Sequence, residues 1–336
     1  MSFSKRFVVL LIMGVFLGGS LFAIDAEDLP PLDGDALNKA LTTYITNVAR
    51  LVPNSSTTQN VWSFPPRTDR GYFGVGVNGS FTMSDRTMVS QLDNAGAGFG
   101  GKEIDMASIP ESIPFLPAGS VDVRFGRRNS DIGITGMWLS ADMIPQLSNF
   151  MGEDSDYTYR MLGFDYRLLL IKEGTNVIFG KEIGFLPARL MPSISVQAGY
   201  YFTWMTFGFS STYMLSGDEV TDSIDIDFRT DSYFFAVQLS KDLPFIKPFV
   251  GFKPIFSSTN SEFSWIANRP VTLGGTEYGL GATYNSGTHN RDTMTYLHLY
   301  GGVGLTFIFP HIITAGFAYN VVTEHFAVTA AVRIIL

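Results

Sequence analysis

The last part of the chain, residues 295–336, shows the strongest pattern. In three stretches, 295–309, 311–321 and 324–336, apolar residues alternate with small or polar ones, and Pro310 separates the first two. This repeat of two is that of a β-strand. The stretches run about ten to fifteen residues, whereas strands of soluble proteins have a mode of about five or six, and about nine to eleven cross a bilayer. We therefore predict that the apolar face meets lipid and the other face lines a lumen.

The same alternation recurs upstream, which predicts an all-β fold: a transmembrane antiparallel β-barrel. The phase of the alternation slips near Met205 and again around Thr230–Ser232, which indicates β-bulges there; if these slips are turns instead, the barrel has twelve or fourteen strands. Otherwise it has about ten, an even number, near residues 71–83, 119–127, 131–141, 157–171, 193–214, 223–241, 247–257, 294–309, 311–321 and 324–336.

The connections between these strands predict the topology. In barrels of this kind both termini and the short turns face the periplasm, and the long loops face outward. The segments 84–118, 142–156 and 258–293 are then external, and 172–192 is an exceptionally long periplasmic connection. Residues 258–293 form either a long outer loop with its own hairpin or two more wall strands.

Two segments precede the predicted barrel, which covers residues 70–336. Residues 1–23 have Lys5 and Arg6 before an apolar run, which is typical of a secretory signal peptide cleaved near Ala23. Residues 24–69 carry apolar residues at helical spacing, Leu37, Leu41, Tyr44, Val48 and Leu51. Such a helical segment either plugs the lumen or lies in the periplasm, and the alternative is a loosely docked amphipathic tail.

Composition narrows the class of protein. The chain is 46% hydrophobic with a mean hydropathy of +0.16, yet no apolar run of about eighteen residues follows residue 23, so helical membrane spans are disfavoured. Without Lys5 and Arg6 the balance is 21 basic against 31 acidic residues, a net charge of −10, so nucleic acid is not an expected partner. The absence of cysteine excludes disulfides and thiolate metal sites.

Charged residues on the predicted inner face are the first candidate site. They could line a water-filled pore and set its selectivity, or they could pair across a closed lumen, because about eight strands enclose a space only just filled by side chains. Both interpretations stay open. The lumen-lining charges are Asp122, Arg124, Asp165, Arg167, Asp225, Asp227, Lys253 and Arg333.

An apolar segment between two strands is the second candidate. The apolar residues of 104–116 lie among three prolines, Pro110, Pro114 and Pro117, which leave few backbone donors. As an exposed loop this segment would form a costly apolar patch. We therefore expect a loop that folds into the barrel mouth and narrows it. Its constriction residues are Met106, Ile109, Ile113, Phe115 and Leu116.

Residues for other chemistry are poorly placed. The four histidines are scattered, so no metal site is expected, and the glycine-rich stretch 94–101 lacks the flanking strand and helix of a dinucleotide site, so no cofactor is expected. His298 is predicted to point inward but has no serine two residues away and no orienting acid. We therefore expect no catalytic residues and no enzyme.

The signal peptide, the even number of aromatic-rich strands and the apolar final residue together resemble the bacterial outer-membrane β-barrel class, although Leu336 stands where that class usually has Phe or Trp. The helical segment before the barrel also looks like the long-chain fatty-acid transporter family. The resemblance implies a place in the cell outer membrane, with its lipid and the barrel assembly machinery as partners. The expected function is a narrow pore for small or amphipathic solutes, and the alternative is a non-transporting surface barrel that acts as an adhesin or envelope anchor.

Overall fold

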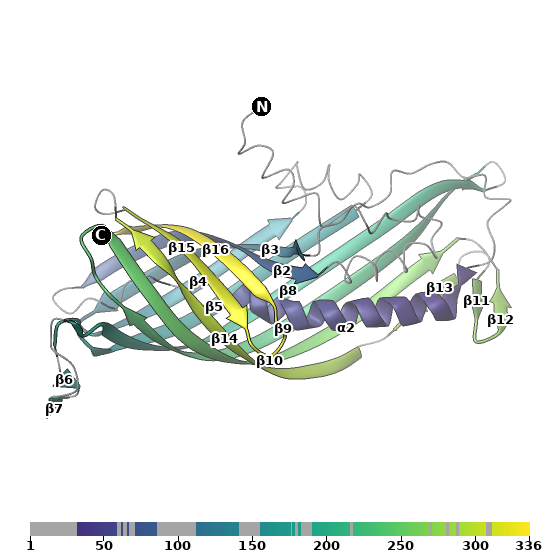
Figure 1. The fold of residues 1–336 in the computed structure, drawn as a ribbon. Coiled ribbons are helices and arrows are strands. Elements are labelled where there is room, and N and C mark those ends of the chain that lie inside the picture. The colour runs from purple at the N-terminus through teal and green to yellow at the C-terminus, as the bar shows by residue number, and fades with distance from the viewer. Residues whose placement is uncertain are drawn as a thin grey trace.

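The computed structural model, drawn as a ribbon in Figure 1, is built around ten long strands. It describes residues 32–58, 62, 66, 71–85, 112–140, 155–175, 177–178, 181–182, 190–215, 218–268, 271–279, 282–286, 289–306 and 311–336. The ten strands are β2 (Tyr72–Asp85), β3 (Ser112–Arg127), β4 (Ser130–Ser140), β5 (Ser155–Ile171), β8 (Ser193–Leu215), β9 (Asp218–Ser240), β10 (Ile246–Ala267), β14 (His289–Leu305), β15 (His311–Asn320) and β16 (Phe326–Ile335).

These strands close into a ring in which each neighbouring pair is antiparallel. The order is β10, β14, β15, β16, β2, β3, β4, β5, β8 and β9, and β9 pairs back to β10. The first and last strands meet through two backbone hydrogen bonds between Phe73 and Leu336, 3.1 and 2.8 Å long. The predicted fold class and the count of ten wall strands are confirmed, and the ring has no free edge.

Shorter strands lie outside the ring. β1 (Leu32–Asp33) pairs in parallel with β11 (Val271–Leu273), which forms a hairpin with β12 (Thr276–Tyr278). β13 (Ala282–Asn285) adds to the end of β10. The connection 172–192 holds the two-residue strands β6 (Val177–Ile178) and β7 (Lys181–Glu182). The segment 258–293 is therefore partly wall and partly an outer hairpin, rather than two more wall strands.

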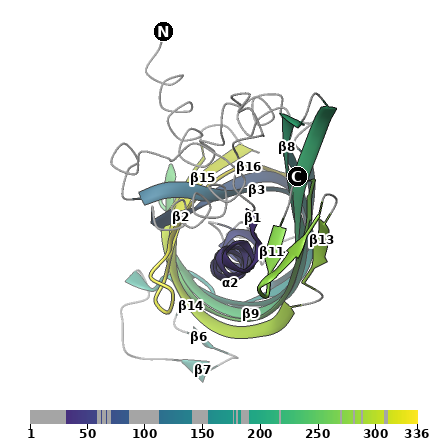
Figure 2. The same ribbon diagram turned by 90° about the vertical axis from the view of Figure 1, so that its right-hand side faces the viewer.

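Among the described residues there is one α-helix, α2 (Gly34–Thr58), and it lies inside the barrel, as the end-on view in Figure 2 shows. Of its apolar residues at helical spacing, Leu37, Leu41, Val48 and Leu51 are buried, whereas Asp35, Lys39, Thr42 and Arg50 are exposed. Among the described residues no helix is long and apolar enough to span a membrane. The helix is thus amphipathic, with one face held against the barrel wall. Its buried apolar residues are Leu37, Leu41, Ile45, Val48, Ala49, Leu51 and Val52.

The wall has two faces over most of its height. β15 and β16 alternate between exposed and buried residues along their whole length. The outward residues are large and apolar, such as Phe317 at 50% and Val332 at 53% exposed, while the inward Thr314 and Arg333 are buried. An apolar outside around a polar inside is the arrangement of a membrane-spanning barrel.

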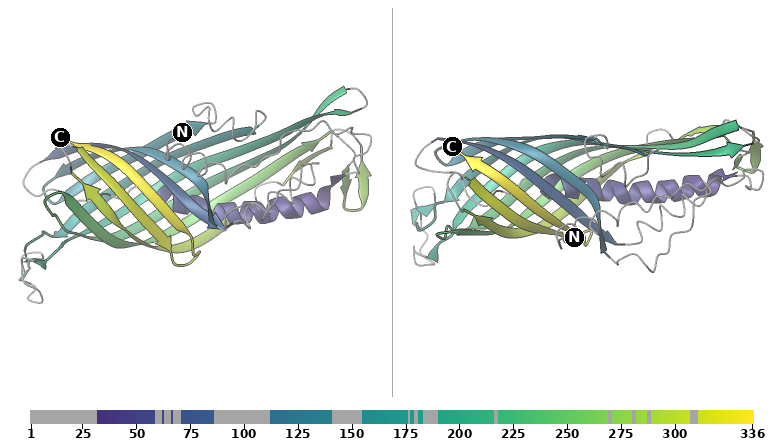
Figure 3. Two further views of the ribbon diagram at one scale, coloured as in Figure 1. Left: turned by 45° about the horizontal axis from the view of Figure 1, so that its top comes forward. Right: turned by 90° about the horizontal axis from the view of Figure 1, so that it is seen from above.

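Three strands continue beyond the others, and there the two faces exchange character (Figure 3). β8, β9 and β10 have 22 or 23 residues, against 10 in β15 and β16. In the outer part of β9, Ile224, Ile226 and Phe228 are buried inside, and Asp225 lies outside, exposed. This outer part of the three strands, here called the extension, is built for water outside and an apolar filling inside.

A row of tryptophans and arginines marks the start of the extension. In register across β4, β5, β8 and β9 stand Trp138, Arg160, Trp204 and Arg229. The Arg160 guanidinium lies 5.0 Å from the centre of the Trp138 ring. Aromatic rings gather where the outer face of such barrels leaves the hydrocarbon, so this row places the membrane boundary near the point where the polarity inverts.

The inversion corrects two predictions about the strands. β8 pairs with β9 without a register shift from Ser193–Ser240 to Leu215–Asp218, so the phase slips near Met205 and around Thr230–Ser232 are neither β-bulges nor turns. The strands run on unchanged, and the apolar residues move to the inner face because the surroundings change from lipid to water outside and from a polar lumen to a helix inside.

The predicted mouth loop is also corrected. Ile113, Phe115 and Leu116 belong to strand β3, and Ile113 and Leu116 pair with Ser84 and Thr82 of β2. β3 accommodates Pro114 and Pro117 here because its pairing with β2 has a register shift between Thr82 and Met83. An irregular pairing tolerates residues that lack a backbone N–H. Met106 and Ile109 lie outside the described residues, so their place at the mouth stays a prediction.

Candidate functional site

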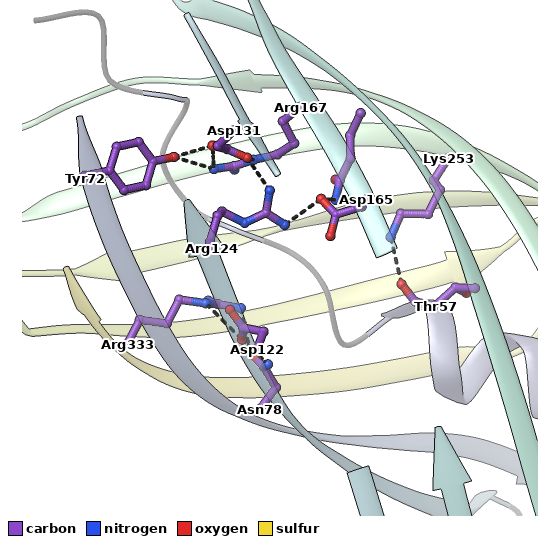
Figure 4. A network of polar contacts seen from close by, with 11 residues as sticks. Thr57, Tyr72, Asn78, Asp122, Arg124, Asp131, Asp165, Arg167, Lys253 and Arg333 are labelled. Carbon is purple, nitrogen blue, oxygen red and sulfur yellow. Dashed lines mark hydrogen bonds and ion pairs between the residues drawn. The ribbon is translucent and has the colours of Figure 1, made fainter. Parts of the chain in front are cut away.

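The candidate site is the lumen at the end of the barrel where β2 begins and β16 ends. The alternation of each strand sends its small and polar residues inward, so the charges arise from several strands at one level. Arg124 of β3, Asp131 of β4, and Asp165 and Arg167 of β5 meet there (Figure 4). Their side chains are between 0% and 3% exposed.

These four residues form one ion-pair network. Arg124 donates to both Asp131 and Asp165, the second with an N–O distance of 2.6 Å. Arg167 donates to Asp131 through Nε at 3.0 Å and Nη2 at 2.6 Å, a two-pronged geometry that suits a carboxylate. The Tyr72 hydroxyl also donates to Asp131, and Gln197 donates to Asp165 at 2.8 Å. Asp131 is therefore the centre of the network.

A second cluster adjoins the first across β2, β3, β15 and β16. Arg333 donates to Asn78 at 2.6 Å and to Thr314 at 3.1 Å, and its Nε lies 3.9 Å from Asp122. Asn78 donates to Asp122 in turn. Gly76 makes room for this cluster, since a Cβ there would lie 2.6 Å from the Asp122 carboxylate and 2.8 Å from Arg333 Cγ.

Trp62 fills the space between the two clusters. The guanidinium carbons of Arg333, Arg124 and Arg167 lie 4.6, 5.0 and 5.5 Å from its ring centre, within the range of a cation–π interaction. Gln238 of β9 donates to its backbone oxygen at 2.7 Å. The indole is 1% exposed. Trp62 follows α2 in sequence, so the amino-terminal segment itself completes the packing of the lumen.

Lys253 of β10 holds the carboxyl end of α2. Its ammonium group donates to the backbone oxygen of Thr57 at 2.7 Å, where a cation is favoured by the helix dipole. It also lies 4.9 Å from the Phe234 ring centre and 5.4 Å from that of Tyr300. Lys253 thus fixes one end of the helix against the wall.

The apolar face of α2 packs against the inner face of the extension. Helix and wall residues belong to one buried cluster, and the Trp265 indole donates to the Asn38 side chain at 2.8 Å. The apolar contact explains why this inner face is not polar like the rest of the lumen. The wall residues of the cluster include Met205, Phe207, Ile224, Ile226, Phe228, Ile255, Phe263 and Trp265.

The structure separates the eight sequence-predicted charges into two groups. Six lie on the inner face and are buried: Asp122, Arg124, Asp165, Arg167, Lys253 and Arg333. Asp225 and Asp227 do not join them, because they lie on the outer face of the extension, where Asp227 accepts a hydrogen bond from Thr206 at 2.7 Å. Their placement in the lumen was wrong because the phase of β9 was read from its apolar residues, which face inward here.

Sequence reasoning missed three members of the site. Asp131 could have been found, since Asp131, Gly133 and Thr135 alternate with the outward Ile132 and Ile134. Tyr72 opens β2 in the inward phase. Trp62 follows no periodic pattern, so only the packing of distant segments reveals it. His298 points inward and is 2% exposed, and among the described residues no group of three or more His, Cys, Asp or Glu could hold a metal ion.

The closed ring, its apolar belt and its polar lumen define the class of protein: the chain is a β-barrel of the bacterial outer-membrane type. No family model matches the chain, and no curated protein matches it.

Among solved structures, the chain is similar to the outer membrane protease OmpT from Escherichia coli, at 12% identity over 82% of this chain and 99% of that one, with a TM-score of 0.40. It is also similar to Ail, the attachment invasion locus protein of Yersinia pestis, at 8% identity over 80% and 99% of the two chains, with a TM-score of 0.26. A Pseudomonas aeruginosa FadL homologue matches at 9% identity over 84% and 96%, with a TM-score of 0.28. Likenesses this distant carry no activity over to the chain.

The sequence-based exclusion of an enzyme is contradicted by these comparisons. One of the similar barrels is a protease, so the class includes enzymes and the fold gives no reason to exclude one. No catalytic residue of this chain follows from that likeness.

Proposed function

We propose that the chain is an outer-membrane channel that its own amino-terminal segment holds closed, and that it passes small or amphipathic solutes when that segment moves. In this proposal the barrel sits in outer-membrane lipid after insertion by the assembly machinery, and the signal peptide is removed near Ala23. The single observation that carries the proposal is a barrel with a polar, charged inner wall that encloses a helix, and this helix is not part of the wall.

The chemistry of the wall supports a lumen that water enters. Around the network the inward residues are serines, threonines, asparagine and glutamine, all buried. For a permanently closed barrel, apolar residues of the same size would be as stabilising or more so, because buried ion pairs seldom repay their desolvation. A polar wall is favourable when water replaces the plug, by which we mean α2 and Trp62.

The attachment of the plug supports movement. α2 takes part in none of the ten strand pairings that close the ring. Apart from the apolar contact, side chains of the wall such as Lys253 and Trp265 hold it through hydrogen bonds to Thr57 and Asn38, and none of these bonds is part of a strand ladder. The segment can therefore leave the lumen without breaking the sheet.

The inner surface also indicates a solute class. Without α2, an apolar trough on the extension would lead to a lumen with Lys253 at the junction and carboxylates and arginines beyond. An amphipathic solute can contact both parts in turn, whereas a free ion gains little from the apolar part.

The test is single-channel conductance of refolded protein in planar bilayers. Deleting residues 24–58 should give a larger and longer-lived open state than the full chain. Leu41→Asp, on the buried face of α2, should open more often than Thr42→Asp on its exposed face, which serves as the matched control. If the deleted barrel folds but conducts no more than the full chain, the channel proposal fails.

A non-transporting surface barrel is the second candidate, and the extension favours it. β8, β9 and β10 carry a polar outer face beyond the membrane boundary, which would suit display to a partner. Unchanged conductance together with loss of cell attachment on shortening the β8–β9 hairpin would put this candidate first.

A further inference from the structure

We propose that α2 enters the barrel from the outside of the cell, so that the amino end of the helix is displayed on the outer surface and its carboxyl end lies in the lumen. The sequence analysis left open whether residues 24–69 plug the lumen or lie in the periplasm, and this proposal differs from the periplasmic alternative. It is independent of whether α2 ever leaves the lumen.

The two ends of the barrel are distinguished by the chain itself. β2 begins and β16 ends at the same end, joined by the Phe73–Leu336 hydrogen bonds. The two-residue turn between β3 and β4, at Arg128 and Asn129, lies there too. In even-stranded outer-membrane barrels the termini and short turns are periplasmic. The opposite end, with the extension and the β11–β12 hairpin, is then external (Figure 1).

The direction of α2 follows from three hydrogen bonds to β10, which starts at the periplasmic end. Lys253 donates to the Thr57 oxygen at 2.7 Å, Thr259 donates to the Ala49 oxygen at 3.5 Å, and Trp265 donates to the Asn38 side chain at 2.8 Å. As the residue numbers rise along β10, the residue numbers of their partners on α2 fall, so the helix is antiparallel to the strand. The helix therefore runs from the external end to the periplasmic end.

The amino end of the helix is fastened at the external end. Leu32 and Asp33 pair in parallel with Val271 and Thr272 of β11, and the Asp35 carboxylate accepts a hydrogen bond from the Gly274 backbone at 2.7 Å. Gly34 allows a close approach here, since a Cβ at this position would lie 3.0 Å from the Val271 side chain and 3.1 Å from the Thr272 backbone oxygen. The amino end of the helix is therefore attached to the hairpin by backbone hydrogen bonds and not by packing alone.

The length of the helix is consistent with this path. Its 25 residues span about 37 Å at about 1.5 Å per residue, more than the apolar band of about 25 Å on such barrels. With its carboxyl end at Lys253 inside the lumen, its amino end extends beyond the band. The helix ends at Thr58, and the next wall strand begins at Tyr72, at the periplasmic end.

Single cysteines test the path, because the native chain has none. Intact cells would be treated with a maleimide on a polyethylene glycol too bulky to enter the lumen. Ala36→Cys on α2 and Thr276→Cys on the β11–β12 hairpin should both be labelled, and Asn129→Cys in the β3–β4 turn should not. All three residues are exposed, and all three variants should be labelled once the outer membrane is permeabilised.

Two outcomes would overturn the proposal. If Ala36→Cys is protected in intact cells while Thr276→Cys reacts, the helix does not emerge outside. If Asn129→Cys reacts and Thr276→Cys does not, the barrel has the opposite orientation. Neither result depends on conductance, so failure of this proposal and failure of the channel proposal are told apart.

Discussion

At the scale of single residues, Asp131 holds the lumen together. It is the shared partner of Arg124, Arg167 and Tyr72, all in an interior where water does not reach the side chains. Removing one partner of a buried ion pair leaves an uncompensated charge, whereas exposed pairs contribute little.

Asp131→Ala should therefore lower the free energy of unfolding by about 3–5 kcal/mol. Asp242→Ala is the matched control: its carboxylate is 62% exposed and pairs with Lys247 at 2.8 Å, so the loss should stay below about 1 kcal/mol. Urea unfolding in lipid vesicles measures both. A small loss for both variants would mean that the network does not stabilise the wall.

Trp62 gives a second prediction at this scale. Trp62→Ala removes the ring that three arginines face, so the plug should be held less firmly and channel openings should become more frequent. Trp62→Phe keeps an aromatic face and should change the opening frequency less. Equal behaviour of the two variants would show that the cation–π contacts do not hold the plug.

At the scale of elements, β9 shows how one strand serves two environments. Its residues alternate without interruption, but Phe235 faces outward where the wall meets lipid, and Asp227 faces outward where the wall meets water. The row of Trp138, Arg160, Trp204 and Arg229 lies between these two levels. The boundary of the membrane therefore falls within the strand, not at its end.

Arginine substitutions on one face of β9 test this boundary. Phe235→Arg should cost about 2–4 kcal/mol if the residue lies near the middle of the membrane. Asp227→Arg, on the same face of the extension, should cost little, because a charge there stays in water. Urea unfolding in vesicles compares them, and similar costs would place the boundary elsewhere.

At the scale of the whole molecule, the wall and the filling are separate structures. The ring closes through strand pairing alone, while α2 covers the apolar inner face of the extension. A barrel without residues 24–58 should therefore still fold, shown by its retained strand signal in circular dichroism and its heat-dependent mobility on gels. Its extension should become more sensitive to proteolysis, because the apolar trough is uncovered. A deletion that prevents folding would show that the helix is needed to form the wall.

The sequence by itself determined the wall. Alternation is a local property, and in β15 and β16 the lipid outside fixes which phase faces out, so the strands, their number and six inward charges could be predicted. Asp225 and Asp227 were misplaced because the alternation alone does not say which face is inward. In the extension the apolar residues face α2 inside the barrel and not lipid outside it. Only the tertiary structure decided the position of Trp62 and the direction of α2. Both depend on contacts with residues far away in the chain, such as Gln238 and Lys253, and such contacts leave no periodic signal in the sequence.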